Sequence, residues 1–164
     1  MVIHDFDLAR FMLGEEPVDV FAIGGRLIDP RMMAELDDYD TSMVILRTAS
    51  GRQCHINTSR TSTFGYDQRV ELLGTKGMIQ SLNRKPNEVR KFGADGAETA
   101  EPYLDFFIER YREAFDAEVS AFVDSVETGA PVQADFEDGR RALMLAEAAM
   151  ISAREGRLVR VDEV

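Results

Sequence analysis

The hydrophobic pattern of this chain changes its period once, near Phe107, and this change constrains the fold more than any other feature. From Pro17 to Phe92, short runs of alternating apolar and polar residues are separated by turn residues, which is typical of antiparallel strands. From Phe107 onwards, apolar residues recur every three or four positions, which is typical of amphipathic helices. A series of strands followed by a series of helices predicts an α+β fold and not a β-α-β alternation.

The strand region contains about six strand-like runs joined by short connections. Ser50-Gly51 is a two-residue hairpin signal, and a second tight turn lies at Gly74-Thr75-Lys76-Gly77. Such connections predict an antiparallel meander. A polar connection, Arg31 to Asp40, has room for one helical turn. The expected strands are Pro17–Ile28, Thr41–Ala49, Gln53–Arg60, Gln68–Leu73, Met78–Leu82 and Asn87–Phe92.

Helices and a final edge strand complete the expected elements. The first helix, His4–Leu13, stops at Gly14, a C-cap glycine. Asp135 can cap a helix that runs to Arg154 and is closed by Gly156. The apolar side of that last helix is expected to contain Leu143, Ala146, Ala149, Met150 and Ala153, and Leu158–Val161 is expected as an edge strand. A long helix, Phe107–Val126, presents apolar residues on one side at Ile108, Tyr111, Phe115, Val119, Phe122 and Val126.

Together these elements predict one domain, residues 1–164, of the α+β class: an open, antiparallel-rich (mixed) sheet with helices packed on one face. The runs Met43–Leu46 and Val70–Leu73 place apolar residues on both faces of their strands. We therefore expect the other sheet face to bind further copies of the chain, giving a homo-oligomer, either a dimer or a tetramer. The alternative is a solvated outer face that carries only a few apolar residues.

Charge and composition narrow the choice of partners. The chain has 30 acidic and 19 basic residues, a net charge of −11. This charge repels phosphate backbones and anionic lipid, so we expect neither nucleic acid nor membrane as a partner. No apolar run approaches the roughly 20 residues that a transmembrane helix needs, and the first residues do not resemble a signal peptide. The single cysteine, Cys54, cannot form an internal disulfide, which fits a cytoplasmic location.

Few residues are candidates for chemistry. His4 lies at the start of the first helix, where the helix dipole favours a neutral imidazole that can accept a proton; a structural role is the alternative. Cys54 and His55 are adjacent in a strand and point to opposite faces, and no Cys/His cluster predicts a metal site. No glycine fingerprint for a nucleotide is present. Thr58–Arg69 is rich in hydroxyl, amide and guanidinium groups, which suits polyol recognition, although a plain polar loop fits equally well.

Three stretches occur in an order that is similar to a known family. They are His4-Asp5-Phe6-Asp7-Leu8-Ala9-Arg10-Phe11, then Phe64-Gly65-Tyr66-Asp67-Gln68-Arg69-Val70-Glu71 with Gly74–Met78, and then Phe107-Ile108-Glu109-Arg110-Tyr111. Over essentially its whole length the chain resembles the C-terminal domain of the glucose-fructose oxidoreductase/inositol dehydrogenase/rhizopine catabolism (Gfo/Idh/MocA) family. It is most similar to the inositol 2-dehydrogenase branch. The resemblance implies the substrate-binding and oligomerisation domain of an NAD(P)-dependent oxidoreductase that acts on the CH–OH groups of a small polyol.

The resemblance also implies roles for individual residues. His4 matches the histidine that deprotonates the substrate hydroxyl, and the aspartate that precedes this histidine in the family falls one position before Met1. Tyr66 matches a position that contacts the polyol, and Asp67 and Arg69 lie beside it. Tyr111 falls near the point where family members approach the cofactor or a neighbouring subunit.

In the family, an N-terminal Rossmann domain binds NAD or NADP and supplies a catalytic lysine; this chain contains neither the glycine fingerprint nor that lysine. We therefore expect NAD or NADP in the intact enzyme, and neither bound cofactor nor turnover for this chain alone. Met1 resembles an internal methionine of a longer protein, from a mis-assigned start, a split gene or a deliberate truncation. The alternative function is a non-enzymatic polyol-binding or assembly module built on the same sheet.

Overall fold

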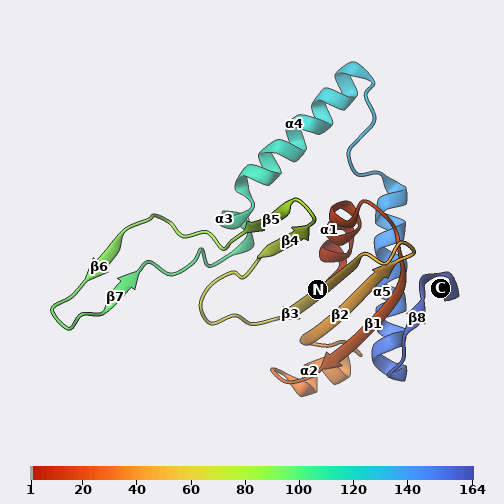
Figure 1. Cartoon of the computed structure of the whole chain (residues 1–164), viewed down its shortest axis with the longest axis horizontal. Helices are drawn as coiled ribbons and strands as arrows, with labels where there is room; N and C mark the ends of the chain where they lie inside the picture. Colours follow the sequence, from red (N-terminus) through yellow and green to blue (C-terminus); the bar gives the residue numbers. More distant parts are fainter. Residues whose placement is uncertain (1) are drawn as a thin grey trace. The chain divides into compact units, whose positions relative to one another are not determined.

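The computed structural model describes residues 2–164, and the chain divides into two compact units. Unit 1 contains both ends of the sequence, Met1–Thr61 and Ala134–Val164, and unit 2 contains the middle, Ser62–Gln133. Unit 1 holds a four-stranded sheet and its covering helices, and unit 2 holds two hairpins and two helices (Figure 1). Each unit therefore has its own secondary structure and is described by itself.

The sheet of unit 1 is antiparallel and has the strand order β3-β2-β1-β8. Gly51, with φ of 91°, allows the tight turn that joins β2 to β3, and the amide of Thr48 donates to the carbonyl oxygen of Arg52 at 2.9 Å. The hairpin and the expected C-terminal edge strand are both confirmed. The strands are β1 (Pro17–Gly25), β2 (Thr41–Thr48), β3 (Gln53–Ser59) and β8 (Val159–Arg160), and the 3-10 helix η1 (Val161–Glu163) follows β8.

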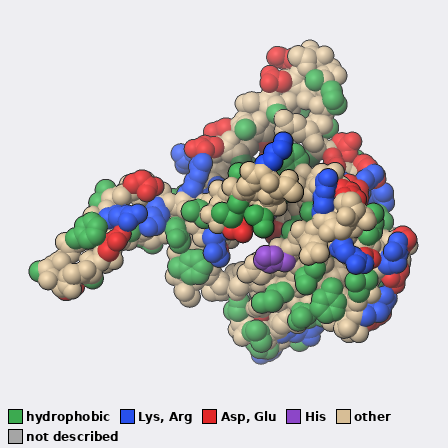
Figure 2. All heavy atoms as spheres, viewed as in Figure 1, with side chains coloured by type: hydrophobic (Ala, Val, Ile, Leu, Met, Phe, Trp, Pro, Cys, Tyr) green, Lys and Arg blue, Asp and Glu red, His purple; other side chains and the backbone are tan. Residues whose placement is uncertain are grey.

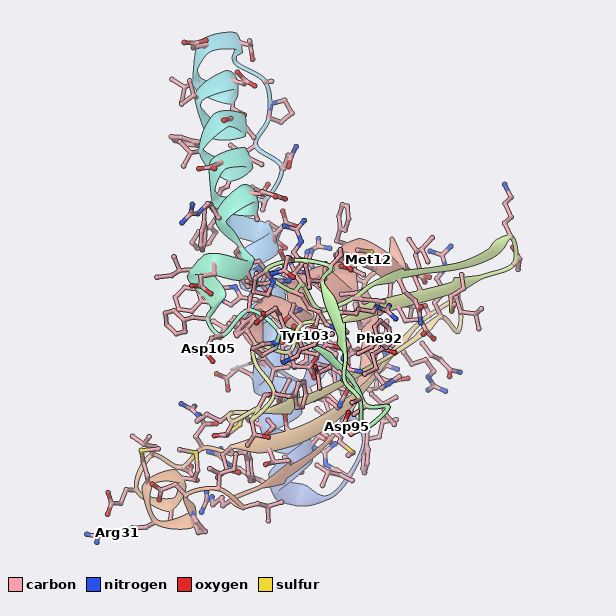
Figure 3. All side chains as sticks on the ribbon, turned by 90° about the vertical axis from the view of Figure 1, so that its left-hand side faces the viewer. Met12, Arg31, Phe92, Asp95, Tyr103 and Asp105 are labelled. Atoms are coloured by element: carbon pink, nitrogen blue, oxygen red, sulfur yellow. The ribbon has the colours of Figure 1, made fainter. Side chains whose placement is uncertain are left out.

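The prediction of a six-stranded sheet is wrong, because the remaining strands pair only with each other in unit 2. β4 (Val70–Gly74) pairs with β5 (Gly77–Ser81), and β6 (Arg90–Phe92) pairs with β7 (Glu98–Ala100). A tight turn determines that two neighbouring strands pair, but it does not determine whether the hairpin joins a larger sheet. β7 was not expected, since its Glu-Thr-Ala sequence has no alternating apolar pattern. Figure 3 labels Phe92 and Asp95 on this second hairpin.

Two helices cover one face of the sheet in unit 1. α1 (Ile3–Leu13) ends at Gly14, whose φ of 61° is left-handed, as the sequence predicts. α5 (Phe136–Glu155) begins with a capping box between Asp135 and Asp138 and ends at Gly156, also as predicted. The core between these helices and the sheet consists of Phe6, Ala9, Val20, Ala22, Val44, Leu46, Ala142, Leu145, Ala148, Ala149 and Val159.

The buried side of α5 overlaps the expected one only in part. Leu143 was expected in the core but is exposed, whereas Leu145 and Ser152 are buried. The hydroxyl oxygen of Ser152 accepts a hydrogen bond from the backbone amide of Ala22 at 2.8 Å, and it donates to the carbonyl of Arg157. Ala149 is buried as expected, and Ala146 and Ala153 pack partly buried against the core, so the expected side is confirmed in part.

The connection between β1 and β2 contains a short helix, α2 (Pro30–Glu35), and is held by the buried carboxylate of Asp40. The oxygens of Asp40 accept hydrogen bonds from the amides of Leu27, Ile28 and Asp29 at 2.9–3.0 Å. Burial by itself would raise the pKa of Asp40, but these backbone hydrogen bonds outweigh it and lower the pKa to about 2. The single helical turn expected in this connection is therefore present and anchored.

The long helix of unit 2 is present but broken. α3 (Phe107–Arg110) and α4 (Arg112–Thr128) meet at Tyr111, whose φ of −107° and ψ of 11° interrupt the helix. No residue of α4 is buried, although the sequence predicts an apolar side that packs on the sheet. In Figure 3 the side chains of α4 extend away from the helix as sticks, with no other helix or strand of unit 2 alongside it.

The sheet face opposite α1 and α5 carries exposed apolar side chains. Ile23 of β1 lies opposite Met43 of β2, and Phe21 lies in one row with Ile45 and His55. Ile23, Met43 and Ile45 are all more than half exposed. Figure 2 shows hydrophobic side chains gathered where β1, β2, β3 and α2 lie in Figure 1. In the described part of the chain, no helix is long and apolar enough to cross a lipid bilayer.

Candidate functional site

His4 lies in the first turn of α1 and is exposed. Phe6 and Ala9 of the same helix are buried against the sheet, so α1 is amphipathic and His4 is on its accessible side. An accessible imidazole can reach a proton on a bound molecule, which a core histidine cannot. The position of His4 is therefore compatible with the role of a general base that the family resemblance implies.

Arg10 anchors the helix that carries His4. Its guanidinium makes two hydrogen bonds of 2.8 Å to Glu16 and donates to the carboxylates of Asp7 and Asp138 at 2.7 and 3.0 Å. The hydrogen bond to Glu16 is the largest influence and raises the pKa of Arg10, although burial opposes it. Because Asp138 belongs to α5, Arg10 ties α1 to α5. No local sequence pattern indicates which carboxylates Arg10 binds.

Tyr66 lies in a loop of unit 2 whose backbone is fixed. The amide of Tyr66 donates to the carbonyl oxygen of Leu104 at 2.8 Å. Gly65 has φ of 115°, and a Cβ atom there would lie 2.8 Å from the Cβ of Tyr103. Only glycine fits this close approach without strain. The loop that presents Tyr66 is thus held in one conformation by a contact almost forty residues away, which the sequence does not reveal.

The ring of Tyr66 packs edge-on against the ring of Tyr111, with their centroids 5.8 Å apart. Tyr111 in turn contacts Phe115 at 6.4 Å, and the guanidinium of Arg110 lies 5.5 Å from the centre of the Tyr111 ring. The break between α3 and α4 is at Tyr111, so the bend lies where the two tyrosines meet. Tyr111 therefore supports Tyr66 within unit 2, and its contact with a cofactor remains a prediction.

Asp67 and Arg69 bind each other. The Arg69 guanidinium donates to both oxygens of Asp67 at 2.7 and 2.9 Å, and the side-chain amide of Asn83 donates to Asp67 at 2.6 Å. The hydrogen bond from Arg69 is the main cause that lowers the pKa of Asp67. The oxygen of Asn83 accepts from the backbone amide of Gln68. Asn83 therefore holds the loop through hydrogen bonds with Asp67 and Gln68. Asn83 was not among the predicted site residues, because no local sequence pattern indicates this role.

The structure brings four of the predicted site residues into one unit. Tyr66, Asp67, Arg69 and Tyr111 belong to unit 2, whereas His4 belongs to unit 1. The polar and aromatic groups of unit 2 can bind hydroxyl groups and the C–H face of a ring. That His4 shares this site remains a prediction.

Neither a metal nor a dinucleotide fits the described residues. Residues 2–164 contain no group of three or more His, Cys, Asp or Glu side chains placed to hold a metal ion. The strand pairings within residues 2–164 are all antiparallel, whereas a dinucleotide-binding fold needs parallel strands joined by a helix. That this chain alone binds no NAD remains a prediction.

Unit 1 also contains a cavity of about 270 Å³ between α1, α5, β1 and β2. Its polar lining residues are Asp38, Tyr39 and Ser42, and the rest of its lining is apolar. A polyol needs a hydrogen-bonding group for nearly every hydroxyl, so this cavity is a poor polyol site. The loop of Tyr66 is the better candidate.

Comparisons with known proteins agree with the fold. Residues 1–161 match the family described as "Oxidoreductase family, C-terminal alpha/beta domain". Inositol 2-dehydrogenase of Rhizobium meliloti (strain 1021) is 45% identical over 161 residues, 98% of this chain and 48% of that protein.

Two solved structures are also similar. A probable dehydrogenase from Thermotoga maritima superimposes with a TM-score of 0.94 and 41% identity, covering 100% of this chain and 49% of that one. A scyllo-inositol dehydrogenase from Lactobacillus casei, solved with NAD(H) and scyllo-inositol, gives 0.87 and 28% identity over 99% of this chain and 47% of that one. The chain thus spans about half the length of these relatives.

Proposed function

Because this chain belongs to the Gfo/Idh/MocA oxidoreductase family, as its C-terminal α/β domain, we propose that it is the substrate-binding and oligomerisation half of an NAD(P)-dependent inositol dehydrogenase. The substrate is a small cyclic polyol. In the intact enzyme the nicotinamide of NAD or NADP accepts the hydride, and this chain contributes the groups that bind the polyol and accept its hydroxyl proton.

The observation that carries the proposal is the fixed loop of unit 2. The backbone of Tyr66 is held by Leu104, its ring by Tyr111, and the neighbouring Asp67 by Arg69 and Asn83. A hydroxyl held in one place can recognise a polyol hydroxyl at a small entropic cost. Asp67 and Arg69 already neutralise each other's charge. In this proposal they therefore hold the loop in shape and form additional hydrogen bonds with the polyol.

His4 is the proposed general base. In a two-domain enzyme that carries this half, His4→Ala should lower kcat by roughly 10²–10⁴-fold, the usual effect of removing a positioned base. Tyr66→Phe removes one hydroxyl and should raise KM by about 2–10-fold with a smaller change in kcat. Tyr103→Phe is the matched control, because it removes a hydroxyl from another tyrosine of the same unit. Normal kcat with a lowered melting temperature in His4→Ala would assign a structural role to His4.

The chain alone should not bind NAD or NADP specifically, because the described residues offer no glycine loop at the start of a helix. Isothermal titration calorimetry with each dinucleotide tests this expectation directly. A dissociation constant in the low-micromolar range for either one would contradict the assignment of the cofactor site to another part of the enzyme.

The proposed assembly surface is the exposed sheet face with Ile23, Met43 and Ile45. Association through this face buries apolar area that otherwise contacts water. Ile45→Glu should therefore release 18.4 kDa monomers, as measured by sedimentation velocity. Leu143→Glu adds the same charge on an exposed side of α5 and serves as control. A wild-type chain that sediments as a monomer at tens of micromolar would exclude the interface.

A second candidate is a non-enzymatic polyol-binding or assembly module built on the same sheet. It predicts that a dinucleotide-binding domain from a relative, added in trans or fused upstream, yields no oxidation of inositol. If that reaction produces NADH, and the His4→Ala variant does not, the result would favour the proposal that the chain is half of a dehydrogenase.

A further inference from the structure

The guanidinium of Arg10 uses all of its donors within unit 1. Its three nitrogens make five hydrogen bonds, which is the full number of N–H groups that this part of an arginine carries. Two go to the carboxylate of Glu16 at 2.8 Å each, and one goes to Asp7 at 2.7 Å. The other two go to the carbonyl and the carboxylate of Asp138, at 3.1 and 3.0 Å. The Arg10 side chain is therefore held in one position.

These hydrogen bonds join three separate parts of unit 1. Asp7 lies on α1, Glu16 in the connection from α1 to β1, and Asp138 in the first turn of α5. α1 packs against α5 (Figure 1). Asp138 is itself fixed, because its carboxylate accepts from the backbone amide of Asp135 at 3.0 Å in the capping box of α5. Arg10 thus ties α1 to the capped end of another helix.

This contact gives α1 a direction that apolar packing does not give. Phe6 and Ala9 bury apolar area in the core of unit 1, but the hydrophobic effect is non-directional and tolerates a small roll or shift of a helix. A bidentate pair between a guanidinium and a carboxylate adds geometric specificity. The rotation of α1 about its own axis therefore depends on Arg10.

His4 shares this helix with Arg10. The two residues are six positions apart, about 9 Å along the helix axis, and Asp7 lies three residues from each of them. A change in the rotation of α1 therefore moves the imidazole of His4. A displacement of about 1 Å in a reacting group can lower a rate by about 10²-fold.

We propose that Arg10 is a positioning residue for His4: it sets the rotation of α1 on α5 and thereby the place of the imidazole. The inference rests on the proposed function, in which His4 is the general base. Arg10 acts through the helix and not on the reacting atoms. Lysine should not replace it, because an ammonium group has three donors and no planar fork.

The first test needs no turnover and uses the full chain. The protein has two histidines, His4 in α1 and His55 in β3, so the imidazole signals in a proton–carbon correlation spectrum give one reporter on the helix and one internal control on the sheet. The spectrum is recorded at about pH 9, well above the ordinary pKa of histidine. In Arg10→Met and in Arg10→Lys we expect the His4 signal to shift and the His55 signal to stay.

Three results of this test would overturn the proposal. They are unchanged signals of both histidines, equal shifts of both, and a shift of His4 in Arg10→Met but not in Arg10→Lys, which would show an effect of charge and not of geometry. Circular dichroism establishes that the variants fold. If Arg10→Met does not fold, Glu16→Gln takes its place, because glutamine cannot accept the bidentate pair but leaves the cation.

The second test is a double-mutant cycle in the two-domain enzyme. Arg10→Met should lower kcat about tenfold when His4 is present. It should change kcat by less than about twofold in the His4→Ala background, because no imidazole is left to position. Val159→Ala is the control for lost stability, since it removes buried methyl groups from β8, at the sheet edge opposite β3, and should leave kcat of the folded enzyme unchanged.

The cycle separates positioning from a general loss of stability. Equal loss of kcat by Arg10→Met in both backgrounds, or the same loss in Val159→Ala, would refute the positioning role. Normal kcat in His4→Ala, or a two-domain enzyme without turnover, would refute the proposed function instead. In that case the imidazole spectra still decide whether Arg10 sets the position of His4.

Discussion

Replacing Arg10 by methionine should destabilise unit 1, because Arg10 is a buried cation shared by three carboxylates. Methionine keeps the aliphatic bulk of the side chain and deletes the guanidinium. The Arg10 side chain is only 7% exposed, and it binds carboxylates of Asp7, Glu16 and Asp138. The substitution leaves these three carboxylates close together without the cation that they share.

The expected size follows from the surroundings of each partner. Breaking a buried ion pair by removing one member costs about 3–5 kcal/mol. The three carboxylates are 35–45% exposed, so water compensates part of the loss. Glu16 also keeps an ion pair with Arg141 at 2.8 Å. We therefore expect Arg10→Met to lower the free energy of unfolding by about 2–3 kcal/mol, and the melting temperature by about 4–12 °C for a chain of this size.

The assay is urea denaturation followed by circular dichroism, with Arg31→Met as the matched control. Arg31 pairs with Glu35 at 3.1 Å on the exposed surface of α2, where its side chain is 90% exposed. An exposed pair of this kind contributes about 0–0.5 kcal/mol. If the two variants unfold within 0.5 kcal/mol of each other, the argument that Arg10 holds α1 to α5 is refuted.

Two further substitutions test the loops. Asp40→Asn keeps the shape of the side chain but removes its charge. The pKa of Asp40 is lowered from 3.8 to about 2 in the folded chain. The stability that the Asp40 carboxylate contributes is therefore complete above pH 4 and is lost as the pH falls towards 2. Urea midpoints from pH 6 to pH 2 should therefore show a gap between wild type and variant that closes at low pH, and a gap that stays constant would contradict this. Gly65→Ala should destabilise the loop of Tyr66 by about 1–3 kcal/mol, because it combines a positive φ with a clash at Tyr103. Hydrogen exchange of the Tyr66 amide should accelerate, and more than in Gly77→Ala, which has a positive φ but open space around it.

The elements that the sequence predicts correctly depend on local chemistry. Gly14, Asp135 and Gly156 end or begin helices because each satisfies helix-terminal groups within a few residues. The turn at Ser50-Gly51 forms the expected hairpin for the same reason. Caps and tight turns are determined by residues that are neighbours in the chain, so they can be read without the fold.

Two of the failures depend on contacts between distant residues. The burial of Ser152 on α5 accompanies its contact with Ala22, 130 residues away, and the pairing of β4 with β5 alone depends on where the chain runs after β3. At the candidate site, His4, Tyr66, Asp67, Arg69 and Tyr111 could be named from the family resemblance. Asn83 and Leu104, which hold the loop, could not, because a backbone carbonyl and a single amide side chain leave no pattern in a sequence.

The hydrogen bond from Ala22 to Ser152 has a consequence for solubility. A strand at the edge of a sheet exposes amides and carbonyls that can recruit a strand from another molecule and start aggregation. On the outer side of β1, β8 pairs only with Asp19 and Val20, and the next amide, that of Ala22, is occupied by a hydroxyl from α5. The Ser152 hydroxyl therefore takes the hydrogen bond from Ala22 that a further strand would need there. Removing the hydroxyl, as in Ser152→Ala, would open a site for cross-β growth at the point where the native ladder stops.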